Sequence, residues 1–441
     1  MSLLVKGGHI IDPANGIDHK MDMLVSEGRI ARLETNIISQ VGDQVINADG
    51  MLVVPGLVDI HAHFGEPGRE DRETISTGTL AAARGGFTTV LMMPDTQPPL
   101  DTPALVAQVL SMAEKQGHIR VHVAGALTKE LAGNEMTEMS ALMQAGATFL
   151  AQPDGPVLHF ALLRNILRYA RNLVPFIAIQ PHDISLTNGI MHEGVDSTIL
   201  GMPGIPASAE EVAVAAAIIL ARETNCRLHL SRLSTAQSIA SVATAKNEGV
   251  PVSCDVSAHH LTLTAKAFAT YDPSCKLLPP LRTADDVAVL IQAVASGVVD
   301  CIATDHTPLT EEENDVELSQ APYGASGIET AFAQLYTGLV LAGKLSISQL
   351  VAALTIRPAQ LLGLTQTGAL TCGYPADFTL IDPQTQITVD PANLISMGKN
   401  TPLTGRKLTG WPVATFVGGE LAWPKETEDT TWRGILPIVC C

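Results

Sequence analysis

The run VPGLVDIHAHF at residues 54–64 decides the fold, because it is an apolar, strand-like segment that ends in two histidines. Seven further apolar runs follow it, and Ala-rich helical stretches separate them, as in a parallel sheet wrapped in helices. These runs lie at 88–94, 120–127, 147–154, 175–183, 227–235, 251–260 and 299–306. Because eight such strands close into a barrel, the sequence predicts an α/β fold with a (β/α)8 barrel of the TIM type.

Short strand-like runs at both ends of the chain predict a second, smaller domain. They fill roughly the first fifty residues, and the same pattern returns late in GALTCGYPADFTLID and ATFVGGELAW. We expect the two ends to meet in one small β-sandwich domain. The predicted division is 1–54 and 364–441 for this domain and the tail, and 55–363 for the barrel.

The composition favours a globular protein and argues against a nucleic-acid partner. Of the 441 residues, 46% are hydrophobic and 16% are charged, so the chain can bury a large core. The formal net charge of -18 disfavours a phosphate backbone, which requires clustered basic residues. No apolar stretch is long enough to span a bilayer, and the first residues alternate like a strand instead of forming a signal peptide. We therefore expect a cytoplasmic protein that binds neither nucleic acid nor membrane.

Several longer motifs follow one another along the chain. They are GLVDIHAHFGEPGREDRETISTGTLAAARGGFTTVLMMPDT, MHEG followed by GMPGIPASAEE, KLLPPLR, IATDHTP, and GALTCGYPADFTLID followed by NTPLTG. In this order they resemble the dihydroorotases of the amidohydrolase superfamily, a branch that also includes hydantoinases and allantoinases. The resemblance covers nearly the whole chain. It implies a metal-dependent hydrolase of cyclic amides; the family reaction converts dihydroorotate and water to N-carbamoyl-aspartate in pyrimidine biosynthesis.

The pair His61 and His63 predicts a metal site at the carboxyl end of the first strand. Residues i and i+2 of a strand point to the same side, so two imidazoles can hold one cation between them. Asp305 ends the eighth strand, which lies beside the first in a closed ring. We expect these three residues to form the walls of one site, with Asp305 as both metal ligand and general base.

The resemblance implies a further ligand at Asp154, where close relatives place an acidic group. It also implies two histidines, at the ends of the fifth and sixth strands, that hold a second metal. This chain has Gln180 and Arg232 at those places. Glutamine is a poor zinc ligand and protonated arginine is none, and His182 would replace the fifth-strand ligand only if the strand changed its path. We therefore expect one divalent ion per chain, with zinc as the expected metal.

The substrate side departs further from the pattern that the resemblance implies. Where dihydroorotases have an arginine, two asparagines and a histidine, this chain has Gly65, Asp95, Leu278 and Leu309. The arginine and the first asparagine of that pattern grip the substrate's carboxylate, so a gap and a negative charge have replaced an anion clamp. Arg69 and Arg72, on the loop after His63, are alternative cations, although exposed loop arginines are usually solvated.

Charge balance at the barrel mouth gives a prediction for Arg232. Without a second cation, Asp154 and Asp305 would repel each other in a partly desolvated cleft. The guanidinium of Arg232 can reach the volume of the missing ion. We therefore expect Arg232 to pair with Asp154 and to replace the second metal electrostatically.

Two functional hypotheses remain open at this point. In the first, the chain is a dihydroorotase-like hydrolase that opens a small cyclic amide with one metal ion, with an altered substrate or low activity. In the second, it is an inactive dihydroorotase homologue that serves as a scaffold for aspartate transcarbamoylase. The retained residues His61, His63, Asp154 and Asp305 favour the first hypothesis, and the lost clamp and histidines favour the second. In either case the resemblance implies a homodimer.

Overall fold

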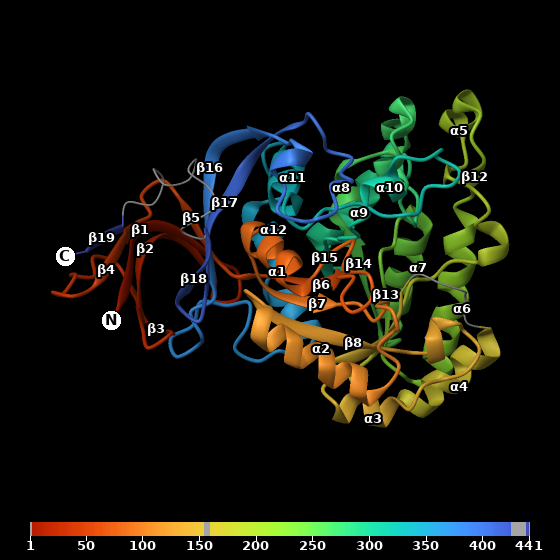
Figure 1. The fold of residues 1–441 in the computed structure, drawn as a ribbon, viewed down its shortest axis with the longest axis horizontal. Helices are drawn as coiled ribbons and strands as arrows, with labels where there is room; N and C mark the ends of the chain where they lie inside the picture. The colour runs from red at the N-terminus through yellow and green to blue at the C-terminus, as the bar shows by residue number, and fades with distance from the viewer. Residues whose placement is uncertain (1, 154–158, 425–437, 441) are drawn as a thin grey trace.

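The barrel expected from the eight apolar runs is confirmed. The computed structural model describes residues 2–153, 159–424 and 438–440, and within them eight parallel strands pair in chain order (Figure 1). They are β6 (Leu57–Ala62), β7 (Phe87–Met92), β8 (Arg120–Ala126), β9 (Phe149–Gln152), β10 (Ile177–Ile179), β13 (Leu228–Leu230), β14 (Val252–Ser257) and β15 (Cys301–Ala303). An isolated bridge between Ala62 and His306 joins the first strand to the segment after the last, so the ring is nearly closed.

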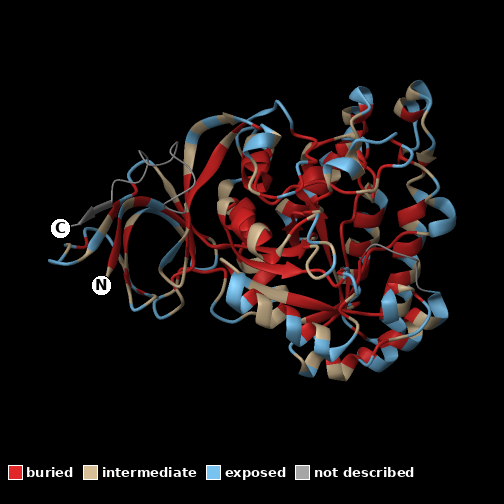
Figure 2. Cartoon of the chain, in the orientation of Figure 1, coloured by how far each residue is buried: buried red, intermediate tan, exposed pale blue. Residues whose placement is uncertain are grey.

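Helices cover the outside of the barrel. They include α1 (Ile75–Arg84), α2 (Pro103–Gln116), α3 (Met139–Gln144), α4 (Phe160–Ala170), α6 (Ser208–Thr224), α7 (Ala236–Asn247), α9 (Ala284–Ser296) and α12 (Ile347–Leu354). Thr74 and Thr283 begin α1 and α9 with capping boxes, which satisfy backbone N–H groups of the first turn. Figure 2 shows the buried strands inside and exposed residues on the outer helix faces. No helix in the described part of the chain is both long and apolar enough to cross a membrane.

Shorter elements lie in the connections that follow the strands. They are β11 (Met191–His192), α5 (Val195–Leu200) and β12 (Gly204–Ile205) after β10, α8 (Ala258–Thr262) after β14, and α10 (Glu311–Asn314), α11 (Ala331–Leu335) and α13 (Ile356–Leu361) after β15. The connections after β10 and β15 extend well beyond the ring of helices in Figure 1. These connections leave the carboxyl ends of the strands, where catalytic loops of this fold lie.

Side chains fill the interior of the barrel. The inner cluster contains Val58, Ile60, Leu91, Met93, Ala124, Phe149, Ala151, Phe176, Ala178, Cys301 and Ala303. Phe149 and Phe176 provide much of its bulk and stack with ring centroids 4.4 Å apart. The barrel is therefore a packed core, and polar chemistry is confined to its ends.

The prediction that the two chain ends form one β-domain is also confirmed. Its strands are β1 (Leu3–Asp12), β2 (Ile17–Ser26), β3 (Arg29–Glu34), β4 (Gln44–Asn47), β5 (Leu52–Pro55), β16 (Phe378–Thr388), β17 (Lys407–Val417), β18 (Glu420–Trp423) and β19 (Ile438–Cys440). They form one mixed sheet that branches at β1, and the pairing of β5 with β16 joins the two ends. The Thr415 hydroxyl donates to the Ala83 carbonyl at 2.6 Å and so ties this sheet to α1.

Asp59, in the middle of β6, fastens the first strand of the barrel to the last. One oxygen of its carboxylate accepts a hydrogen bond from the backbone N–H of Thr304 at 2.9 Å, and the other accepts from the Thr304 hydroxyl. Both residues are buried. Burial raises the pKa of Asp59 to about 6, although the hydrogen bonds from Thr304 act in the opposite direction. The carboxylate is therefore costly to bury, and its bonds to Thr304 offset that cost.

We predict that Asp59→Ala lowers the free energy of unfolding by about 3 kcal/mol, because it leaves two buried donors of Thr304 without an acceptor. Urea denaturation followed by circular dichroism measures the change. The matched control is Asp315→Ala, which truncates an exposed aspartate and should change stability by less than about 0.5 kcal/mol. Equal stability of the two variants would contradict the role given to Asp59.

Candidate metal centre

The three residues expected to form a metal site come together. Ligand atoms of His61, His63 and Asp305 all lie within 4.8 Å of one another, and all three side chains are buried. The Nε2 atoms of the two histidines are 3.1 Å apart. His61 lies near the end of β6, His63 directly follows this strand, and Asp305 follows β15, so the group lies at the carboxyl end of the barrel.

Two departures from regular strand geometry place these side chains. The pairing of β6 with β7 shifts between Asp59 and Ala62, so Ile60 belongs to the inner cluster while Ala62 belongs to the outer core. This shift turns His61 toward the barrel mouth. Asp305 has a φ of 54°, in the left-handed region that non-glycine residues rarely adopt. The chain turns sharply there, as strained residues at functional sites often do.

Asp95 fixes the orientation of the His63 ring. Its Oδ2 atom lies 2.7 Å from His63 Nδ1, on the loop that follows β7. Because a carboxylate only accepts hydrogen bonds, Nδ1 carries the hydrogen, and the Nε2 atom of a neutral His63 then presents its lone pair to the site. A carboxylate that orients a metal-binding histidine in this way is a common feature of metal sites.

The donor set suits a divalent ion. Burial lowers the pKa of His61 well below its usual value, and the nearby charge of Arg232 lowers it further, so this imidazole is neutral at physiological pH. Two imidazole Nε2 atoms 3.1 Å apart, with a carboxylate beside them, match the nitrogen and oxygen ligands that zinc prefers. His61, His63 and Asp305 therefore fit the metal that was expected from the sequence. Asp154 lies outside the described residues, so its role as a ligand stays a prediction.

Gln180 and Arg232, at the places where the resemblance implies histidines, are bonded to each other. Arg232 Nη2 donates to Gln180 Oε1 at 2.5 Å, and Arg232 Nη1 donates to Asp305 Oδ1 at 2.6 Å. Arg232 is 2% exposed and Gln180 is 7% exposed. The group of metal-ligating atoms found among the described residues does not include His182. The expected pairing of Arg232 with Asp154 also stays a prediction, because Asp154 lies outside the described residues.

A buried network that the sequence did not reveal holds the backbone of Arg232. Arg232 follows β13 with a φ of 56°, and its N–H donates to Asp255 Oδ1 at 2.9 Å. The other oxygen of Asp255 lies 2.8 Å from His229 Nε2, and His229 Nδ1 lies 2.8 Å from the Ser253 hydroxyl. These residues are spread over two strands, and no sequence spacing connects them. The network shows that the position of Arg232 is firmly determined.

The substrate side lacks the clamp that the resemblance implies. A Cβ atom at Gly65 would lie 1.9 Å from the carbonyl oxygen of Arg69, so the present loop leaves no room for any side chain there. Asp95 contacts His63, as described above. Leu309 is buried, its backbone N–H donates to the Asn400 side chain, and Leu278 precedes Pro279 in a partly buried turn. Gly65 has no side chain, Asp95 is bonded to His63, and Leu278 and Leu309 are apolar, so none of the four positions provides the contact that the resemblance implies.

Arg69 and Arg72, the alternative cations, are already paired with acidic groups. Arg69 bonds both Asp71 and Glu313, and Arg72 bonds Glu313 through two of its nitrogens. Burial alone would raise the pKa of Glu313, but the hydrogen bonds from Arg72 and Arg69 outweigh it and lower the pKa to about 2. An anionic substrate would have to displace this carboxylate before either arginine could bind it.

Comparison with known proteins identifies the family. The sequence model of the amidohydrolase family matches residues 52–422. A dihydroorotase of Pelotomaculum thermopropionicum is 46% identical over 422 residues, which is 96% of this chain and 98% of the relative. The chain belongs to the amidohydrolase family. A dihydroorotase of Thermoanaerobacter sp. (strain X514) is 41% identical and covers 97% of this amidohydrolase, with 99% of its own length aligned. These relatives confirm the dihydroorotase branch that the motifs indicated.

Solved structures support the same fold. The L-hydantoinase of Arthrobacter aurescens superposes on this amidohydrolase with a TM-score of 0.86 at 24% identity, over 95% of both chains. A D-hydantoinase from Thermus sp. gives a TM-score of 0.81 at 22% identity, over 95% of this chain and 94% of the other. At such identities the likeness establishes the barrel and its accompanying β-domain, and nothing about substrate.

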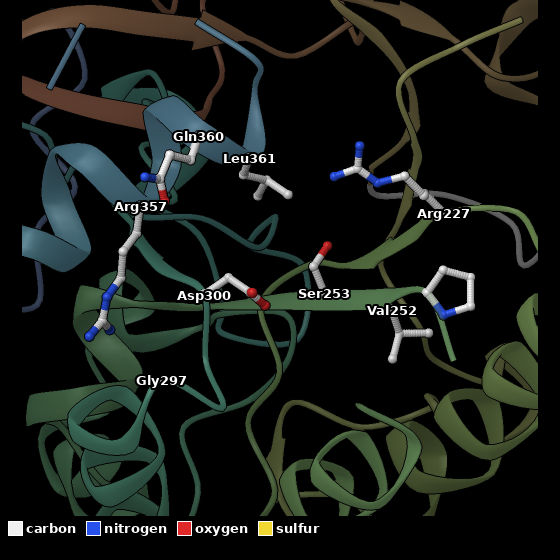
Figure 3. A pocket seen from close by; sticks show the side chains of 9 residues that line it. Arg227, Val252, Ser253, Gly297, Asp300, Arg357, Gln360 and Leu361 are labelled. Carbon is white, nitrogen blue, oxygen red and sulfur yellow. The ribbon is translucent and has the colours of Figure 1, made fainter. Parts of the chain in front are cut away.

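A separate pocket lies at the opposite end of this amidohydrolase's barrel. It has a volume of about 450 Å³ and opens beside the amino ends of β13, β14 and β15; Arg227 and Arg357 lie on opposite sides of it, with Ser253 between them (Figure 3). Asp300, in its wall, already accepts a hydrogen bond from Lys246 at 2.6 Å. Barrels of this type carry their chemistry at the carboxyl ends of the strands, so this pocket is not the catalytic site.

We predict that Asp95→Ala weakens metal retention by about 10- to 100-fold, because His63 loses the partner that sets its tautomer and orientation. Competition with a chelator of known affinity measures the change. Gln97→Ala, which truncates an exposed residue on the same loop, is the matched control and should leave retention unchanged. If Asp95→Ala retains metal as well as the control does, the orienting role of Asp95 is wrong.

Proposed function

We propose that this chain hydrolyses the C–N bond of a cyclic amide with one divalent ion, zinc, held by His61, His63 and Asp305. The observation that carries the proposal is the approach of these three buried ligands to within 4.8 Å. It is supported by the amidohydrolase family match and by relatives named dihydroorotase. The scaffold hypothesis gains no comparable support, because an inactive homologue has no need to keep a buried and oriented ligand set.

The residues of the chain divide the work of ring opening. The bound ion would supply the positive charge that polarises the amide carbonyl. Asp305 accepts one proton from the attacking water as the water oxygen bonds the carbonyl carbon, and it returns this proton to the ring nitrogen as the C–N bond breaks. The new carboxylic acid then releases the second proton of the water to solvent, so the product carries a carboxylate and one additional N–H. Arg232 donates a hydrogen bond to one oxygen of Asp305 at 2.6 Å and so holds this carboxylate in place for the proton transfer.

The preferred substrate in this proposal is a ring without a carboxylate group. Gly65 contributes no side chain, and Asp95 adds a negative charge near His63. Arg69 and Arg72 are neutralised by Glu313, and Leu309 is apolar. A dihydroorotate carboxylate would therefore meet repulsion in place of a bidentate partner. A neutral cyclic amide or imide meets no such penalty.

We predict that zinc-loaded protein opens a neutral ring such as hydantoin or dihydrouracil with a kcat/KM at least about 100-fold above that for dihydroorotate. Each lost charged hydrogen bond costs about 2 kcal/mol of binding, and two lost contacts exceed this factor. Ring opening followed by ultraviolet absorbance measures all three reactions.

The controls use two histidine variants. His61→Ala removes a proposed ligand and should abolish turnover, whereas His19→Ala removes an exposed histidine on β2 and should leave it intact. Protein that binds zinc but opens none of these rings would overturn the proposed activity. Saturable turnover of micromolar dihydroorotate would instead refute the preference for a neutral ring.

A further inference from the structure

We propose that Arg232, held by Gln180, is a protein-borne cation that takes the place of a second metal ion, so that this site binds one divalent ion and excludes another. This inference rests on the proposed function, because it assumes that the His61, His63 and Asp305 set holds an ion. It goes further than the proposed function because it gives Gln180 and Arg232, which stand where the family has metal-binding histidines, a common role in excluding a second ion.

The contacts between the two replacement residues carry the inference. Gln180 follows the fifth barrel strand, β10, and Arg232 follows the sixth, β13. The guanidinium Nη2 of Arg232 donates to the amide oxygen of Gln180 at 2.5 Å. Both side chains are buried. If the two histidine ligands had been lost independently, the residues that replace them would not be expected to form a hydrogen bond with each other. Gln180 and Arg232 therefore form a matched pair that fills the place of the missing ligands.

The second contact of the guanidinium brings its charge to the metal centre. Arg232 Nη1 lies 2.6 Å from Asp305 Oδ1, so the fixed positive charge bonds a proposed metal ligand directly. In a two-metal site, the second ion would balance the negative charge of this carboxylate, and no arginine would be needed beside it. A divalent ion placed beside a buried guanidinium would meet strong repulsion, because arginine does not lose its proton in proteins.

The backbone network explains why Arg232 does not swing away to admit a second ion. Its N–H is bonded to Asp255, and Asp255 is bonded in turn to His229. All three residues are buried, and the left-handed φ of 56° directs the arginine side chain to Gln180 and Asp305. Displacing the guanidinium would break its buried hydrogen bonds to Asp305 and Gln180. The cation is thus a permanent part of the site.

The decisive experiment restores both ligands with the double variant Gln180→His, Arg232→His. Wild-type protein and the variant are loaded with excess zinc and desalted, and zinc per chain is measured by elemental analysis. We expect one ion in the wild type and two in the double variant. The control, Gln144→His, Arg168→His, adds the same residue types on the exposed faces of α3 and α4 and should stay at one ion.

A spectroscopic measurement on the unaltered protein makes the test independent of whether the variant folds. Wild type loaded with Mn²⁺ should give the electron paramagnetic resonance spectrum of an isolated ion, and a folded double variant should give that of a coupled pair. Two ions in the wild type, no ion in the wild type, or one ion in a folded double variant would each overturn the inference. Failure of the proposed function is distinguishable, because it appears as one bound ion without turnover of any ring.

Discussion

The hydrogen bonds between Asp59 and Thr304 are the constraint on which the rest of the site depends. They join the first and last strands of the barrel, whose sequence positions are 245 residues apart. His61 lies two residues after Asp59, and Asp305 directly follows Thr304. Closing the ring therefore also brings the side chains of His61 and Asp305 close together. The backbone N–H of His63 continues the closure by donating to the His306 carbonyl at 2.8 Å.

The barrel could be predicted because its signal is periodic and repeated. Eight apolar runs separated by helical stretches leave few other architectures, and a histidine pair at i and i+2 has a geometric meaning on any strand. The same reasoning placed Asp305 beside His61, since the first and last strands of a closed ring are neighbours. The shift in strand pairing at Asp59 could not be foreseen, because a bulge leaves little trace in the pattern of one sequence.

Contacts between side chains on different strands were the part that the sequence could not supply. Asp95 was recognised as a change in charge, but its bond to His63 depends on how the loop after β7 folds back over β6. Arg232 was expected to act as a cation, but its bonds to Gln180 and Asp305 follow from a left-handed backbone that no propensity predicts for arginine. Asp255 and His229, which hold the backbone of Arg232, lie within β14 and β13 and not at the strand ends where functional residues of this fold are expected.

The mouth of the barrel is also more fully bonded than a solvated active site would be. Glu313 is held by Arg69 and Arg72, and Asp305 by Arg232. Pairs of this kind limit the charges that remain for an incoming ligand.

The crowding around Gly65 has an evolutionary consequence. Because the carbonyl oxygen of Arg69 occupies the space that any Cβ would need, a single codon change at position 65 cannot reinstall an arginine that works. The loop would first have to rebuild, and its present shape is stabilised by the Arg69 N–H bond to the Gly65 carbonyl and by the arginine pairs with Glu313. The order of substitutions is therefore constrained: the loop has to change its path before an arginine at position 65 can enter the site, so no one-step mutation of this chain installs the clamp.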